Sequence, residues 1–188
     1  MFGAEGSYTD FCVLGLLILK AMTIYELNKE FKATIGLFYS ASLGSLQVVL
    51  RQLLAKGHIS MREIPKGRRM RKVYTITEAG QESFFQTMHA PIPASRLEET
   101  SLARLYFLGL LSDASERGRV LTLITATIGA VLTELEARKA ELGRLSIPME
   151  YQTIFRYQAK TLDYGIMAHK AALEWFVAVD RDAGNNRR

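Results

Sequence analysis

The stretch ISMREIPKGRRMRKVYTIT, residues 59–77, predicts two short β-strands joined by a basic turn. Its two ends, residues 59–64 and 72–77, are rich in β-branched and aromatic residues, which favour strands. Between them Gly67 marks a turn. Residues 62–72 contain six Lys or Arg and one acidic residue, Glu63. The sequence therefore predicts a β-hairpin with a positively charged tip.

The charge of this hairpin has two interpretations. A basic cluster on a short segment is the usual footprint of phosphate binding. A solvated surface loop has the same composition. The formal net charge of the chain is +5, and residues 1–90 hold 11 Lys or Arg against 7 Asp or Glu. Charge alone supports both interpretations equally, so the decision depends on the neighbouring elements.

Three helices are predicted ahead of the hairpin. The first lies in the opening 20 residues, where apolar residues recur three or four apart. The second covers residues 24–35, with Thr23 and Glu26 as a capping box and Gly36 just past its end. The third covers residues 43–56, begins after Ser42 and stops at Gly57.

The third predicted helix has one apolar side and one exposed side. The apolar side consists of Leu43, Leu46, Val49, Leu50, Leu53 and Leu54. The exposed side consists of Gly44, Ser45, Gln47, Val48, Arg51 and Gln52. The apolar side is therefore expected to pack in the core, and the exposed side to face solvent or a binding partner.

Three helices followed by a basic hairpin is the element order of a winged helix-turn-helix domain. The major groove of DNA admits one α-helix, whose polar side chains reach the base edges. Gln47 suits an adenine edge, and Arg51 suits a guanine edge or a phosphate. Ser42 and Ser45 lie at the helix start, where backbone N–H groups favour phosphate. We therefore expect residues 1–90 to bind double-stranded DNA.

The exposed Val48 and the basic wing complete the predicted interface. Val48 could contact a thymine methyl group, although a single exposed valine needs no explanation. The wing would add affinity that does not depend on sequence, along the DNA backbone or in the minor groove. Its predicted contacts are Lys66, Arg68, Arg69, Arg71 and Lys72.

Three stretches resemble the PadR family of bacterial regulators. They are residues 13–17 with 22–27, residues 38–59, and residues 67–80. The last is the most specific, because it contains the spacing Lys-x-Tyr-x-Ile-Thr-x-x-Gly. The resemblance spans about residues 11–85. It implies a homodimer on a palindromic operator, usually repression, and in some members release by a small aromatic or amphipathic ligand.

Two departures from the family pattern concern the predicted reading helix and the second helix. Gln47 stands where the family often has Tyr, and Val48 where it often has Pro. The residues before Tyr25 are Thr23 and Ile24, without the common His-Gly. Because Gln47 and Val48 face the groove, these changes bear on the operator sequence rather than on the fold.

The C-terminal part, residues 95–182, is predicted to be a helical, coiled-coil-like dimerisation domain, which makes the protein mainly α-helical. Its first long helix starts near Asp113, with Glu116 completing a capping box. A shorter helix over residues 97–111 is expected to join the same bundle. Both long helices carry apolar residues spaced alternately three and four apart, as in coiled coils. The predicted interface residues are Phe155, Leu162, Ile166, His169, Leu173 and Phe176.

The long helices leave alternatives open. We call each of these apolar rows a seam. A helix of about 30 residues is roughly 45 Å long, so we expect part of each seam to pack against a second chain. The alternative to this homodimer is a hairpin in which the two helices pack only against each other.

The aromatic residues of the last helix could line a pocket for a small aromatic effector, although at helical spacing they also suit a core or a dimer interface. His169 could act as a pH-sensitive group or as a partly wet interface residue.

The remaining classes of protein find less support. The three histidines have no metal-ligand spacing, and the sequence has no phosphate-binding glycine loop or nucleophile motif. We therefore predict no enzyme, no metal and no cofactor. A winged helix that binds proteins or senses small molecules without specific DNA binding remains the alternative. Cys12 lies in an apolar run, which predicts that it is a buried core residue. No apolar stretch approaches the roughly 20 residues that a membrane span needs. Acidic residues rather than basic ones precede the first apolar run, which argues against a signal peptide. We therefore expect a cytoplasmic protein.

Overall fold

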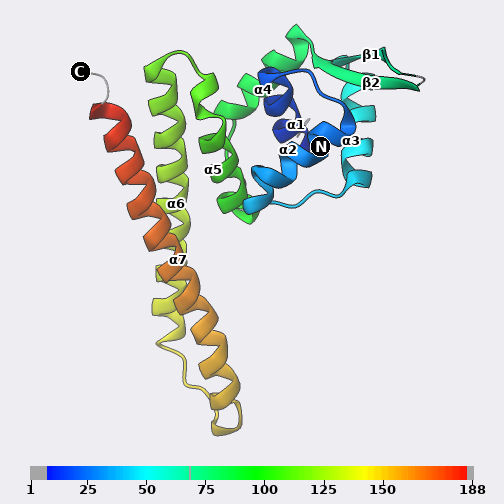
Figure 1. The fold of residues 1–188 in the computed structure, drawn as a ribbon. Helices are drawn as coiled ribbons and strands as arrows, with labels where there is room; N and C mark the ends of the chain where they lie inside the picture. The colour runs from blue at the N-terminus through cyan, green and yellow to red at the C-terminus, as the bar shows by residue number, and fades with distance from the viewer. Residues whose placement is uncertain (1–7, 68, 186–188) are drawn as a thin grey trace. The chain divides into compact units, whose positions relative to one another are not determined.

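The chain folds into two compact units. The computed structural model describes residues 8–67 and 69–185 (Figure 1). The first unit contains residues up to Ala90 together with Glu98–Phe107, and the second contains Pro91–Leu97 together with the residues from Leu108 onward. Each unit has its own buried core, so each is described separately.

The first unit has the element order predicted from the sequence. Its elements are α1 (Tyr8–Leu19), α2 (Ile24–Ala33), the short 3-10 helix η1 (Ile35–Leu37), α3 (Leu43–Ala55), β1 (Ile59–Lys66), β2 (Arg69–Ile76), α4 (Glu78–His89) and α5 (Leu97–Tyr106). The predicted three helices and hairpin are confirmed, and they form a winged helix-turn-helix. Met22 forms an isolated bridge with Tyr74, which ties the α1–α2 connection to the inner part of β2.

The start of α2 follows the sequence prediction, but its end does not. The backbone N–H of Thr23 donates to Glu26 Oε2 at 2.7 Å, and the N–H of Glu26 donates to Thr23 Oγ1 at 3.3 Å, which completes the capping box. The helix ends at Ala33, and Gly36 lies inside η1 without a positive φ. The prediction that the helix runs to residue 35 and ends at Gly36 is therefore wrong.

The hairpin is longer and more regular than predicted. The strands pair antiparallel from Ile59↔Ile76 out to Lys66↔Arg69, so only positions 67 and 68 lie between them. Gly67 has a φ of 61°, which glycine adopts without the strain that a side chain would add. Because a two-residue turn holds both strands in register, basic residues expected in a loop lie instead on strands.

The core of the first unit includes α5. Phe11 of α1 stacks on Phe84 of α4 with ring centroids 4.8 Å apart, and Phe107, which follows α5, meets both rings edge-on. The Tyr8 hydroxyl donates a 2.7 Å hydrogen bond to the Glu99 carbonyl of α5. The predicted placement of this helix in the C-terminal bundle is therefore wrong, since the Tyr8 hydrogen bond and the contacts of the adjoining Phe107 hold it against α1 and α4.

The second unit is dominated by an antiparallel hairpin of α6 (Ala114–Leu142) and α7 (Gln152–Asn185). Two ion pairs of 2.7 Å cross between the helices, Lys139–Asp163 and Glu136–Lys170. Three 3-10 helices complete the unit: η2 (Ala94–Arg96), η3 (Leu108–Leu110) and η4 (Met149–Tyr151).

The start of α6 differs from its prediction. The Asp113 carboxylate accepts from the N–H of Ser115 at 2.7 Å, which caps the helix. Glu116 forms an ion pair with Arg119 at 3.4 Å. The predicted capping box between Asp113 and Glu116 is thus wrong, because the neighbouring serine offers the nearer partner.

Helix α6 is also apolar enough to correct one sequence expectation. Its length and a mean hydropathy of 1.5 over its most apolar stretch would suffice to cross a membrane. The expectation that no stretch reaches this measure is wrong for α6. Val120, Leu121, Ile124 and Ile128 of this helix are nevertheless buried. Only 22% of the apolar stretch is buried in the single chain.

Candidate nucleic-acid interface

Helix α3 presents the exposed face that its sequence predicted. Leu46, Val49, Leu50 and Leu53 are buried and fix the orientation of the helix. The opposite side consists of exposed Ser42, Gly44, Ser45, Gln47, Val48, Arg51 and Gln52. Val48 is 43% exposed within this polar arc. An exposed helix with amide, guanidinium and hydroxyl groups on one side has the chemistry to reach DNA base edges.

The two serines at the start of α3 already have roles in the helix. Ser42 Oγ accepts from the N–H of Ser45 at 3.1 Å, and Ser45 Oγ donates to the Ser42 carbonyl at 2.8 Å. Both side chains remain exposed. They hold the first turn in place, and the N–H groups of that turn are suited to an anion such as a phosphate.

The strand register divides the predicted wing contacts between two faces. Side chains alternate along a strand, and paired residues point to the same side. Arg69 and Arg71 therefore share a face with Arg62, a residue that the sequence reasoning did not select. Lys72 lies on the other face, opposite Glu63. The side chains of Lys66 and Arg68 lie outside the described part of the chain.

Arg71 has an acidic neighbour on α2. Its Nη1 lies 3.8 Å from Glu26 Oε1, the same carboxylate that caps α2. Hydrogen bonding from Thr23, with a smaller contribution from Arg71, lowers the pKa of Glu26 below its usual range. Glu26 therefore stays ionised at neutral pH, and it connects the wing to the start of α2. The two residues are 45 positions apart, so no local pattern in the sequence predicts this contact.

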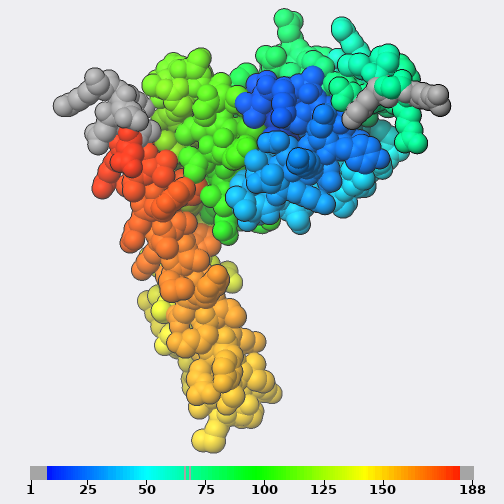
Figure 2. Space-filling view, viewed as in Figure 1, coloured from blue at the N-terminus to red at the C-terminus, as the bar shows by residue number. Residues whose placement is uncertain are grey.

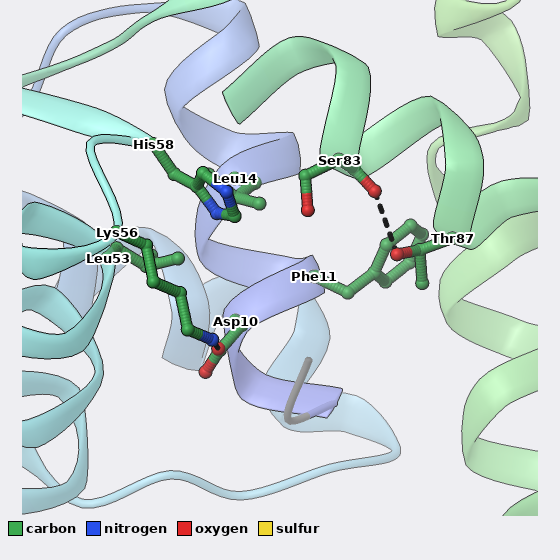
Figure 3. A pocket seen from close by; sticks show the side chains of 8 residues that line it. All are labelled: Asp10, Phe11, Leu14, Leu53, Lys56, His58, Ser83 and Thr87. Carbon is green, nitrogen blue, oxygen red and sulfur yellow. Dashed lines mark hydrogen bonds and ion pairs between the residues drawn. The ribbon is translucent and has the colours of Figure 1, made fainter. Parts of the chain in front are cut away.

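The other end of α3 is anchored to α1 (Figure 3). Lys56, which follows the helix, lies 3.4 Å from Asp10 Oδ2, and the Asp10 side chain is only 5% exposed. Asp10 Oδ1 has no hydrogen-bond partner among the described residues. It borders a cavity of about 20 Å³ that is also lined by His58, Ser83 and Thr87. A cavity of this size holds about one water molecule, which would satisfy the free carboxylate oxygen.

The predicted interface residues on α7 face α6 of the same chain. Ile166 and Phe176 are 7% and 4% exposed, and Phe155, Leu162, His169 and Leu173 are half-buried. His169 Nδ1 lies 2.7 Å from the Gly165 carbonyl of its own helix. These apolar residues of α7 therefore pack largely within one chain. This corresponds to the alternative in which the two long helices form an intramolecular hairpin.

A second row of side chains lies on the opposite side of α7. We call it the outer stripe, and it consists of Ile154, Tyr157, Tyr164, Met167 and Trp175. All five are between 50% and 67% exposed. Figure 2 shows one side of α7, coloured orange to red, open along the length of the helix. Large apolar side chains gathered on one exposed helix face are typical of an interaction surface.

The titratable groups offer little for catalysis. Among the described residues, no group of three or more His, Cys, Asp and Glu could hold a metal ion. Cys12 is fully buried, and burial raises the pKa of its thiol to about 12. Because the thiolate is the reactive form, this cysteine is expected to be inert at neutral pH.

Comparison with known proteins identifies the domain that carries α3 and the wing. Residues 13–86 match the model of the Transcriptional regulator PadR-like family. This part of the chain is similar to a PadR-like domain. It extends from α1 into α4, and it includes the exposed face of α3 and both strands of the wing.

The chain is also similar to a curated regulator. The chain is 30% identical over 105 residues to the Negative transcriptional regulator PadR of Bacillus subtilis, covering 54% of this chain and 57% of that protein. The chain thus matches little more than half the length of that relative.

Solved structures with similarity to this chain include two regulators. The crystal structure of Bacillus subtilis PadR in complex with operator DNA is 23% identical, with a TM-score of 0.44, covering 93% of this chain and 98% of that one. The PadR-like regulator BC1756 from Bacillus cereus is 24% identical, with a TM-score of 0.43, covering 97% and 99%. The Bacillus subtilis regulator also has a structure in complex with p-coumaric acid.

Proposed function

We propose that this protein is a transcriptional regulator that binds duplex DNA through α3 and the β1–β2 wing. The observation that carries the proposal is the exposed arc of α3, with Gln47 and Arg51, in the same PadR-like domain as a wing with Arg69 and Arg71 on one face. α3 would read base edges in the major groove, and the wing would contact phosphates. Arg62 joins the proposed wing contacts because it shares their face.

We further propose that the protein binds a palindromic operator as a homodimer. A two-fold symmetric dimer places two reading helices on two half-sites, which is why such operators are palindromic. The outer stripe of α7 and the incompletely buried apolar stretch of α6 are the surfaces that support a second copy. The named seam residues, Phe155 to Phe176, would then stabilise the hairpin on which this interface is built.

The sign of regulation and the cellular location follow from the same family likeness. The relative from Bacillus subtilis is described as a negative regulator, and we propose repression for this chain as well. A protein that acts on chromosomal DNA in a bacterium would be cytoplasmic. A small aromatic effector that releases the DNA is a further part of the proposal, supported by the complex of the Bacillus subtilis protein with p-coumaric acid.

A winged helix that binds another protein is the second candidate. The exposed Val48 and the exposed Ile64 and Met70 of the hairpin are the observations in its favour. We call the face of the wing that carries Arg62, Arg69 and Arg71 the outer face. These arginines count against the second candidate, because a cationic surface suits a polyanion. DNA binding that is weak and independent of sequence would favour this second candidate.

Substitution of Gln47 tests the proposed base readout. Gln47→Ala should lose roughly 1–3 kcal/mol of discrimination between operator and random DNA, since the amide can pair with both groups of an adenine edge. Affinity for random DNA should change little. The measurement is a fluorescence-anisotropy titration with both DNAs.

Gln52→Ala is the matched control for this test. It removes the same side chain from the same helix, farther from its N-terminal end, and it is also exposed. Gln52→Ala should keep most of the discrimination. If Gln47→Ala weakened operator and random DNA equally, base readout by Gln47 would be rejected.

A further inference from the structure

The carboxylate of Glu26 is divided between two partners. One oxygen, Oε2, accepts from the backbone N–H of Thr23 at 2.7 Å and from the hydroxyl of the same residue at 2.8 Å. The other oxygen, Oε1, lies 3.8 Å from Arg71 Nη1 on the wing. The cap of α2 therefore uses one oxygen and leaves the other beside the arginine.

The contact between Glu26 and Arg71 is an ion pair without a hydrogen bond. A separation of 3.8 Å is too long for a hydrogen bond, so this carboxylate does not use the N–H donors of the guanidinium. Both side chains are about half exposed, at 42% for Arg71 and 53% for Glu26. Exposed pairs of this kind are weak. The contact therefore restrains Arg71, and a stronger acceptor can break it.

A DNA phosphate is such an acceptor. It can accept two parallel, charge-assisted hydrogen bonds from one guanidinium. Arg71 shares its wing face with Arg62 and Arg69, and this is the face proposed to contact DNA. Glu26 is ionised at neutral pH, because hydrogen bonds from Thr23 lower its pKa. The carboxylate and a phosphate would therefore compete for the same arginine.

We propose that Arg71 changes partner when DNA binds, so that Glu26 holds it in the free protein and a phosphate holds it in the complex. The inference rests on the proposed DNA binding and deepens it, because it makes Glu26 a residue that limits the affinity for DNA. Since phosphates are the same in every sequence, this limit applies to any duplex. The restraint in the free protein exists without DNA and can be measured without it.

Glu26→Gln tests the exchange, because glutamine also completes a capping box and only the charge is lost. The titration uses a duplex of random sequence at low salt with the wild type, Glu26→Gln, Arg71→Gln and the double variant. Glu26→Gln should bind about 1.5- to 5-fold more tightly than the wild type, the range expected for release of an exposed ion pair. The gain should largely disappear when Arg71 is already replaced. An equal gain in both backgrounds would indicate simple charge repulsion and overturn the exchange.

Glu30→Gln is the matched control. It removes the same charge from the same helix, but the partner of Glu30 is Lys20, at 3.9 Å, rather than a wing residue. Its affinity for the random duplex should match that of the wild type. A gain as large as that of Glu26→Gln would overturn a specific role for Glu26.

Thermal unfolding without DNA measures the restraint itself. The loss of Tm on Glu26→Gln should be about 1–4 °C larger in the wild-type background than in the Arg71→Gln background, because only the former has the pair to lose. Equal losses would overturn the restraint, whatever the DNA titration shows. If the Tm difference were present but the wild type bound no duplex, the proposed function would fail together with the exchange, and the pair would be a structural contact only.

Discussion

Single residues explain the most specific motif of the sequence, which ends in Thr77 and Gly80. Thr77 Oγ1 accepts from the N–H of Gly80 at 3.2 Å and donates to the Gly57 carbonyl at 2.7 Å. A Cβ atom on Gly80 would lie 2.0 Å from the His58 carbonyl oxygen. The motif therefore joins the end of the wing, the start of α4 and the end of α3.

Gly80→Ala should destabilise the protein by about 1–3 kcal/mol, the usual cost of forcing extra atoms into a packed site. Chemical denaturation of the first unit measures the effect. Gly44→Ala is the control, because its Cβ would meet only Ser42 Oγ at 3.7 Å. That substitution should be neutral or stabilising, since glycine weakens helices. Equal stability of Gly80→Ala and the wild type would contradict the close contact seen here.

Local residue roles were predictable from the sequence, whereas distant pairs were not. The Thr23–Glu26 capping box and the stop at Gly57 depend on neighbouring positions, and both were predicted. The Lys56–Asp10 and Arg71–Glu26 pairs join residues about 45 positions apart and carry no local pattern. The burial of Arg104 on α5, which is only 2% exposed, was missed for the same reason, because it depends on tertiary packing.

At the scale of elements, the wing shows how strand pairing overrides local propensity. The basic residues at positions 69 and 71 resemble a loop by composition, but the pairing out to Lys66↔Arg69 makes them strand residues. The strand then assigns each side chain to a face, which composition cannot do. The arginines at 62, 69 and 71 share the outer face, and Lys72 is opposite Glu63.

Removal of the outer-face charges should reduce the salt dependence of DNA binding. In Arg69→Ala with Arg71→Ala, the slope of log affinity against log salt should fall by about 1.8, or about 0.9 per lost phosphate contact. Lys72→Ala changes the charge by the same amount per residue on the other face and should leave the slope nearly unchanged. The same loss per charge from both faces would rule out a face-specific wing contact.

At the scale of the whole molecule, the sequence predicted that each long helix of the C-terminal half has a row of apolar residues. It assigned part of these rows to contacts with a second chain, whereas the structure uses the row of α7 largely within one chain. A 3-4 spacing shows that a helix has a buried seam, and it does not show whether the neighbour is in the same chain. The structure packs the predicted seam of α7 against α6 and leaves the outer stripe exposed. A sequence pattern of aromatics outside the seam was the signal that could have revealed this second surface.

The outer stripe predicts a dimer that charge substitution should separate. The wild-type chain should have twice the 21.1 kDa mass of one chain in light scattering coupled to gel filtration. Tyr157→Glu with Tyr164→Glu should give monomers, because carboxylates are costly to bury without partners. Gln158→Glu, on the flank of the same helix, should remain dimeric. A monomeric wild type would contradict the proposed assembly.

The most direct test of the account is a fluorescence-anisotropy titration of the wild-type protein against its own upstream DNA and a scrambled duplex, at two salt concentrations. The account predicts salt-sensitive binding with a preference of about 10³-fold or more for the upstream DNA. Equal weak binding to both duplexes at both salt concentrations would contradict specific DNA recognition by α3.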